Sequence, residues 1–169
     1  MHYCLFLSDK FRWDSRTIGT SSANAPFTNQ TNVVSFKEFV LFTGITSIPY
    51  GVGFSGCTKI QSIAWPANLR TLSGGNMNSP ALKLVEFQDK ITTIGNMACF
   101  TNSASLTVVC RASTPPSLGT GNNSFGDRAV NRINVYVPDE SVDTYKAATR
   151  WSAFATKIHP LSEYMGDNL

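Results

Sequence analysis

A four-residue unit, apolar-x-x-apolar, recurs along the middle of the chain at a nearly constant interval. It reads Ile45–Ile48, then Leu69–Leu72, then Ile91–Ile94, and the starts of successive copies are 24 and 22 residues apart. A regular interval of this length is typical of chains built from stacked structural repeats. The repeat therefore constrains the fold more than any other feature of the sequence.

A second series of the same unit runs in step with the first. Its copies are Ile60–Ile63, Leu82–Val85 and Leu106–Val109, with starts 22 and 24 residues apart. One coil cannot cover its own apolar face, so successive coils must stack and bury a continuous core. We therefore expect Ile48, Leu72 and Ile94 to lie above one another in successive coils.

The segments between the two series contain residues suited to the interior of a coil. Phe54 and Cys57 follow the first unit, and Cys99 and Phe100 follow the third. The middle copy has no aromatic residue, so we expect Met77 to take its place. A final partial copy places Val135-x-Val137-Pro138 where an earlier one has Ile63-x-Trp65-Pro66.

These segments resemble the BspA-like class of leucine-rich repeats, a bacterial surface-antigen type. The stretch from Phe42 to Pro66 carries the pattern most closely, and Ile91–Phe100 repeats it with Cys99 before the aromatic residue. The resemblance covers about residues 36–164. It implies a binding surface, exposed at the cell surface or secreted, with roles in adhesion or in host or matrix interaction.

We accordingly expect a β-rich solenoid, a right-handed leucine-rich-repeat coil of short strands with about four coils and a C-terminal helical cap. Residues 1–35 would form an N-terminal cap or arm, with a loop at 20–32. Residues 36–138 would form the solenoid, and residues 139–169 the C-terminal cap. Together they would make one structural domain.

The two ends of the array are predicted to be covered by helices. At the C-terminus we expect one helix over 139–149, capped by Asp139 or Ser141, and a short helical turn over 151–157. The apolar stripe of the cap would consist of Val142, Tyr145, Ala148, Trp151, Phe154 and Ile158. Near the N-terminus, the spacing of Phe36, Phe39 and Phe42 predicts a helical turn on the first coil.

Composition and motifs argue against several classes of function. The net charge is +3 with no dense basic run, so no nucleic-acid partner is predicted, and no apolar stretch is long enough to insert into a membrane. The four cysteines form no C-x-x-C pair, which argues against a zinc site. Cys57, Cys99 and Cys110 lie among apolar residues, so we expect buried free thiols, with a disulfide between two of them as the alternative in a secreted protein. His2 and His159 lie near no nucleophile motif. We predict no enzyme activity, catalytic residue, cofactor or metal.

The predicted function is a binding module for a protein or glycan, with an unknown oligomeric state. The candidate ligand-facing residues occupy the x positions of the repeat unit: Thr46, Gln61, Arg70, Lys83, Thr92 and Thr107. The alternative is a structural or receptor-binding component of a larger assembly, such as a phage tail. The absence of a visible signal peptide favours this alternative, in which the chain would be a virion component.

Overall fold

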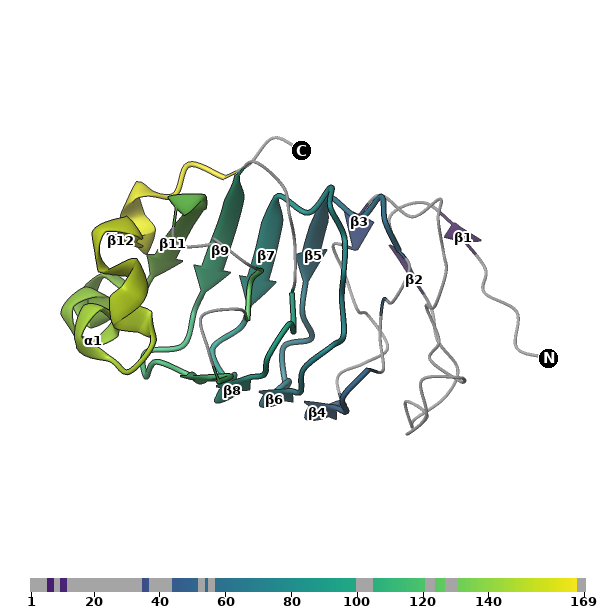
Figure 1. Ribbon diagram of the computed structural model, residues 1–169, viewed down its shortest axis with the longest axis horizontal. Helices are drawn as coiled ribbons and strands as arrows, with labels where there is room; N and C mark the ends of the chain where they lie inside the picture. The colour runs from purple at the N-terminus through teal and green to yellow at the C-terminus, as the bar shows by residue number, and fades with distance from the viewer. Residues whose placement is uncertain are drawn as a thin grey trace.

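The chain forms two parallel β-sheets that face each other across one core in the computed structural model (Figure 1). The structure describes residues 6–7, 10–11, 35–36, 44–51, 54, 57–99, 105–120, 124–126 and 131–166. Four successive coils each contribute one short strand to each sheet, and two further strands extend the larger sheet. This two-strand repeat accounts for the two interleaved apolar series in the sequence.

The smaller sheet has four strands in the order β10-β8-β6-β4. Its strands are β4 (Ser47–Ile48), β6 (Thr71–Leu72), β8 (Thr93–Ile94) and β10 (Ser117–Leu118). Ile48 is in register with Leu72, Leu72 with Ile94, and Ile94 with Leu118. All four side chains are buried, so the predicted apolar column is confirmed and extends one coil further.

The larger sheet has six strands in the order β12-β11-β9-β7-β5-β3. They are β3 (Ser35–Phe36), β5 (Ser62–Ala64), β7 (Leu84–Phe87), β9 (Leu106–Cys110), β11 (Ile133–Val137) and β12 (Ile158–Pro160). Its buried column consists of Ile63, Val85, Val108, Val135 and Ile158, each in register with the next. The predicted equivalence of Ile63 and Val135 is confirmed.

The third copy of the second series was placed one residue too far along the chain. Val85 pairs with Val108, and Val109 pairs with Glu86 on the opposite face of the sheet. The sequence is ambiguous here because Leu106, Val108, Val109 and Cys110 are all buried, so apolar residues occupy both faces of β9. When apolar residues occupy both faces of a strand, the apolar pattern does not specify the register of the strand. The register is then seen only in the backbone hydrogen bonds.

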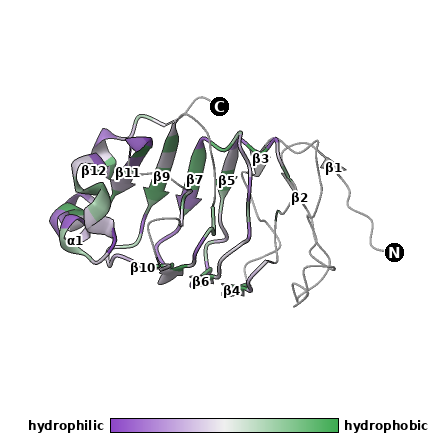
Figure 2. Ribbon diagram, viewed as in Figure 1, coloured by the Kyte–Doolittle hydropathy of each residue, from purple (hydrophilic) through white to green (hydrophobic). Residues whose placement is uncertain are grey.

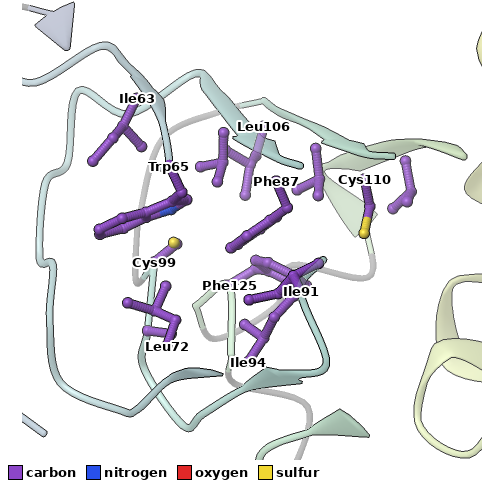
Figure 3. Close-up of a cluster of buried hydrophobic side chains, with 14 of the residues drawn as sticks. Ile63, Trp65, Leu72, Phe87, Ile91, Ile94, Cys99, Leu106, Cys110 and Phe125 are labelled. Carbon is purple, nitrogen blue, oxygen red and sulfur yellow. The ribbon is translucent and has the colours of Figure 1, made fainter. Parts of the chain in front are cut away.

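The interior between the sheets is filled by side chains from the strands, such as Leu72 and Phe87, together with large side chains from the connecting segments, such as Phe125 (Figure 3). Phe54 and Met77 form an isolated parallel bridge, which confirms that Met77 takes the aromatic's place in the second coil. The amide of Cys99 donates to the Ser124 carbonyl as the amide of Phe54 donates to that of Asn76. Cys99 thus fills the same position in the third coil, beside the indole of Trp65.

The three cysteines that the structure describes, Cys57, Cys99 and Cys110, are free and buried, as predicted. Burial raises the pKa of the Cys99 thiol to about 12, against a smaller lowering by its hydrogen bond with Trp65. The thiol therefore stays protonated near neutral pH. Cys4 lies outside the described residues.

The C-terminal cap covers the last coil with short helices. They are η3 (Asp139–Ser141), α1 (Val142–Ala147), η4 (Trp151–Lys157) and η5 (Leu161–Glu163). Tyr145, Trp151 and Phe154 are buried, and Val142 and Ala148 pack against the core, as the predicted apolar stripe requires.

Two local predictions at the ends of the array were wrong. Neither Asp139 nor Ser141 caps a helix with its side chain; the Asp139 carboxylate instead accepts a hydrogen bond of 3.0 Å from the Ser162 amide. Phe36 lies in strand β3, in register with Ile63, and not in a helical turn. Phe39 and Phe42 lie outside the described residues, as does the loop predicted at 20–32.

A short antiparallel hairpin precedes the solenoid in the sequence. Its strands are β1 (Phe6–Leu7) and β2 (Lys10–Phe11), with Phe6 in register with Phe11. Among the helices of the described residues, none is long and apolar enough to cross a membrane. Figure 2 shows hydrophobic residues in the strands of both sheets, as expected when each strand turns one side toward the core.

Candidate functional site

The six predicted ligand-facing residues divide between the two sheets. Thr46, Arg70 and Thr92 immediately precede β4, β6 and β8 on the smaller sheet, whereas Gln61 and Lys83 precede β5 and β7 on the larger one. Thr107 lies within β9. The predicted residues therefore form no single surface.

On the smaller sheet the three candidates form one exposed row. The amide of Arg70 donates to the Thr46 carbonyl over 2.8 Å, and the amide of Thr92 donates to the Arg70 carbonyl over the same distance. The Thr92 hydroxyl also donates to the Arg70 carbonyl, over 2.9 Å. These bonds fix the row and leave the three side chains exposed.

On the larger sheet the three candidates do not form an equivalent row. The amide of Lys83 donates to the Gln61 carbonyl, but Thr107 is in register with Leu84, one position past Lys83. Because the third copy was placed one residue too far along the chain, the predicted position Thr107 does not lie level with Gln61 and Lys83. The smaller sheet is therefore the better candidate for a continuous binding surface.

A groove of about 350 Å³ adjoins the row on the smaller sheet. Two of the predicted residues, Arg70 and Thr92, line it. The rest of the lining comes from the segments that lead into β8 and β10: Asp89, Lys90, Ile91, Ala112, Ser113, Thr114 and Pro115. Ile91 and Ala112 are buried, whereas the polar side chains of the lining are exposed.

The groove carries two cationic groups and one anionic group. The ammonium of Lys90 donates to the side-chain carbonyl of Asn68 on the preceding coil, over 2.5 Å. The Arg70 guanidinium has no hydrogen-bond or ion-pair partner among the residues that the structure describes. Within the described part of the chain, Asp89 is the one anionic side chain that lines the groove beside these two cations. The groove therefore suits a ligand that offers acceptor oxygens or a negative charge.

Sequence reasoning missed Asp89, Lys90, Ser113 and Thr114. The segments that carry them, 88–92 and 112–116, occupy equivalent places in successive coils and differ in residue type. The equal spacing of these segments from the following apolar unit could have identified them in the sequence. The register of β8 and β10 shows directly that they lie side by side.

A corner of tightly packed backbone lies on the other side of the smaller sheet. A Cβ added at Gly95 would lie 2.5 Å from the Gly74 nitrogen, so only glycine allows the two coils to approach this closely. The ring of Tyr50 lies against Gly75, where an added Cβ would be 3.0 Å from the ring. The side-chain amide of Asn96 donates to the Thr120 hydroxyl over 2.7 Å.

The residues that the structure describes contain no group of three or more His, Cys, Asp or Glu side chains that could hold a metal ion. The polar side chains of the groove are the hydroxyls of Thr92, Ser113 and Thr114, the cationic groups of Arg70 and Lys90 and the carboxylate of Asp89, which can bind a ligand by hydrogen bonding and charge.

Two parallel sheets of short strands, stacked coil on coil around one core, define a leucine-rich-repeat solenoid. The chain belongs to the BspA-type leucine-rich repeat family, whose model matches six copies over residues 27–145. Such modules are typically non-catalytic and generally bind proteins. Among curated proteins, none matches the chain significantly.

Proposed function

We propose that the chain is a non-catalytic module that binds a protein or glycan ligand through the smaller sheet and its groove. One observation carries this proposal: Thr46, Arg70 and Thr92 form an exposed row, and two of them also line the groove. A repeated scaffold allows such outward residues to vary without disturbing the core. The row and the groove together supply a surface on which specificity can be built.

We further propose an adhesive role at the cell surface or in the extracellular space. BspA-type repeat proteins are often surface antigens, which supports this location. In this proposal residues 1–35 are an N-terminal cap or arm, and residues 139–169 complete the solenoid as its C-terminal cap. A role as a virion component is the alternative.

The binding site can be tested with paired variants on the two sheets. An array of purified extracellular-matrix proteins and glycans is probed with the wild type, with Arg70→Ala/Thr92→Ala and with Gln61→Ala/Lys83→Ala. The first variant should lose fivefold or more in affinity for whatever the wild type retains, and the second should match the wild type. The reverse ranking would move the site to the larger sheet.

Solution mass separates the adhesive module from the assembly component. A monomer by light scattering is expected for a free binding module. A trimer that dissociates when residues 1–35 are removed would favour the assembly alternative.

A further inference from the structure

Four hydroxyl groups form a row across the outer face of the smaller sheet. Ser47 is in register with Thr71, Thr71 with Thr93, and Thr93 with Ser117. Because side chains alternate along a strand, these four point away from the core that holds Ile48 and its partners. We call this row the hydroxyl ladder. The Ser117 hydroxyl lies 3.3 Å from that of Thr93.

The ladder repeats at the spacing between neighbouring strands, about 4.8 Å. The sugar residues of an extended polysaccharide follow one another at a similar interval. A polysaccharide laid along the solenoid axis would therefore meet one protein hydroxyl for each sugar. Serine and threonine hydroxyls both donate and accept, as sugar hydroxyls do.

The hydroxyl ladder alone is too small to make up an ordinary protein interface. Strands of two residues are about 7 Å long, and three steps between strands are about 14 Å, so the ladder covers on the order of 100 Å². A stable protein partner commonly needs about 800 Å² on each side. A narrow strip of this kind suits a rod-shaped ligand.

An exposed aromatic ring borders the ladder on one side. Tyr50 follows β4 and is 70% exposed, although its ring lies against Gly75. Because Gly75 has no side chain, one side of the Tyr50 ring packs directly against the backbone, and the rest of the ring is exposed. An aromatic surface held in this way can pack against the apolar C–H face of a sugar ring.

Positive charge borders the ladder on the other side. Arg70 directly precedes Thr71 of the ladder, and Lys90 lines the same groove. An arginine guanidinium pairs with a carboxylate through two parallel hydrogen bonds. Asp89, also on the groove, can accept hydrogen bonds from sugar hydroxyls.

We infer that the outer face of the smaller sheet binds a linear polysaccharide bearing carboxylate groups, laid along the solenoid axis across β4, β6, β8 and β10. The inference rests on the proposed function and specifies its ligand. The hydroxyl ladder sets the axis of the ligand, Tyr50 packs against a sugar ring, and Arg70 pairs with a carboxylate.

The ligand class is tested with polygalacturonate, alginate and hyaluronan, each compared with its own methyl ester. Esterification keeps the chain and removes the negative charge. By biolayer interferometry, at least one of the acidic polymers should bind, and its ester should bind at least tenfold more weakly. Equal binding of acid and ester, or no binding of any polymer, would overturn the inference.

Variants then locate the site for the polymer that binds. Arg70→Gln should weaken binding fivefold or more and reduce its salt dependence, because one charge contact is lost. Thr71→Val/Thr93→Val keeps the branched side chains and removes two hydroxyls, and should weaken binding threefold or more. Tyr50→Ala should have a similar effect.

Lys83→Gln removes a cation from the larger sheet and should leave affinity unchanged. Circular dichroism and thermal unfolding verify that each variant is folded.

The outcomes separate this inference from the broader proposal. If the wild type binds a matrix protein through Arg70 and Thr92 but no acidic polymer, the carbohydrate ligand is wrong and the binding surface stands. If Lys83→Gln weakens polymer binding and Arg70→Gln does not, the proposed surface itself is wrong.

Discussion

The indole nitrogen of Trp151 donates a hydrogen bond of 2.7 Å to the carbonyl oxygen of Pro116. Two neighbouring cap residues act in the same way: the Tyr145 hydroxyl donates to the Ala112 carbonyl over 2.8 Å, and the Arg150 guanidinium to that of Leu118. The C-terminal cap thus satisfies backbone acceptors in the segment 112–118, which connects β9 to β10 and includes β10, while its rings cover the core. Closing the solenoid requires polar contacts as well as apolar ones.

Replacement of Trp151 by Phe should therefore destabilise the protein although an aromatic ring remains. Trp151 and Pro116 are both buried, so the carbonyl would lose its partner without access to water. We expect a loss of about 1–3 kcal/mol in the free energy of unfolding, measured in urea. Ser152→Ala, at an exposed position of the same helix, is the control. Equal stability of Trp151→Phe and wild type would contradict this assignment.

Met97 occupies a backbone conformation that glycine adopts in the preceding coils. Three residues after the registered Ile48, Leu72 and Ile94, the φ angles are 69° at Gly51, 68° at Gly75 and 52° at Met97. Met97→Gly should raise the free energy of unfolding by about 0.5–1 kcal/mol, because relief of strain exceeds the added backbone entropy. Met97→Ala keeps the unfavourable φ and should bring no gain. If Met97→Ala were also stabilising, the gain in the free energy of unfolding would come from removal of the exposed methionine side chain and not from relief of backbone strain.

The close approach of coils at Gly95 predicts a severe effect of one methyl group. Gly95→Ala would place its Cβ against the Gly74 backbone, which cannot move without shifting a whole coil. We expect a loss of about 3 kcal/mol or more in the free energy of unfolding. Gly44→Ala, where no atom lies within 4 Å of the added Cβ, should change it by less than about 0.5 kcal/mol. Comparable chemical-denaturation midpoints for the two variants would show that the corner is more adaptable than its geometry indicates.

The buried thiols should resist alkylation in the native state. At pH 8 the Cys99 thiol is almost wholly protonated, because its pKa is raised to about 12, and burial also raises the pKa of Cys110. In a Cys4→Ser variant, iodoacetamide should modify no thiol of the native protein and three after unfolding in urea, as counted by mass spectrometry. Stoichiometric labelling of the native variant would be evidence against a closed core.

Acid should release the segment after β12 before the solenoid unfolds. The hydrogen bond from Ser162 lowers the pKa of Asp139 below its ordinary value of 3.8. A carboxyl group with a lowered pKa stabilises the folded contact above its ordinary pKa, and this contribution is lost as the pH falls through the folded pKa. The protection factor of the Ser162 amide, which corrects the observed exchange rate for the intrinsic effect of pH, should therefore fall below about pH 4. Asp139→Ala should show a low protection factor at this amide at every pH, and an unchanged protection factor in this variant would refute the link.

The repeat in the sequence was sufficient to predict the apolar column of the smaller sheet, because solenoid coils impose the same inward positions on each copy. Ile48, Leu72 and Ile94 alternate with polar neighbours, and their register was predicted correctly. Leu106–Cys110 does not alternate, so its register depended on backbone pairing that the sequence does not display. The error at Thr107 has the same origin.

Only part of the candidate site could be predicted, since x positions in a repeat identify outward residues without showing which of them share a face. Arg70 and Thr92 were identified in this way. Lys90 and Ser113 come from connecting segments whose apolar pattern is weak, and their proximity arises from stacking. The capping prediction for Asp139 failed because a distant amide, that of Ser162, competes for the same carboxylate.

The pairing of each strand with only its immediate neighbours has a mechanical consequence. Hydrogen bonds between coils run parallel to the long axis, so tension applied from end to end pulls directly on them, and the weakest interface separates first. Under load the molecule would lengthen in steps, one coil at a time, while the coils beyond the break keep their shape.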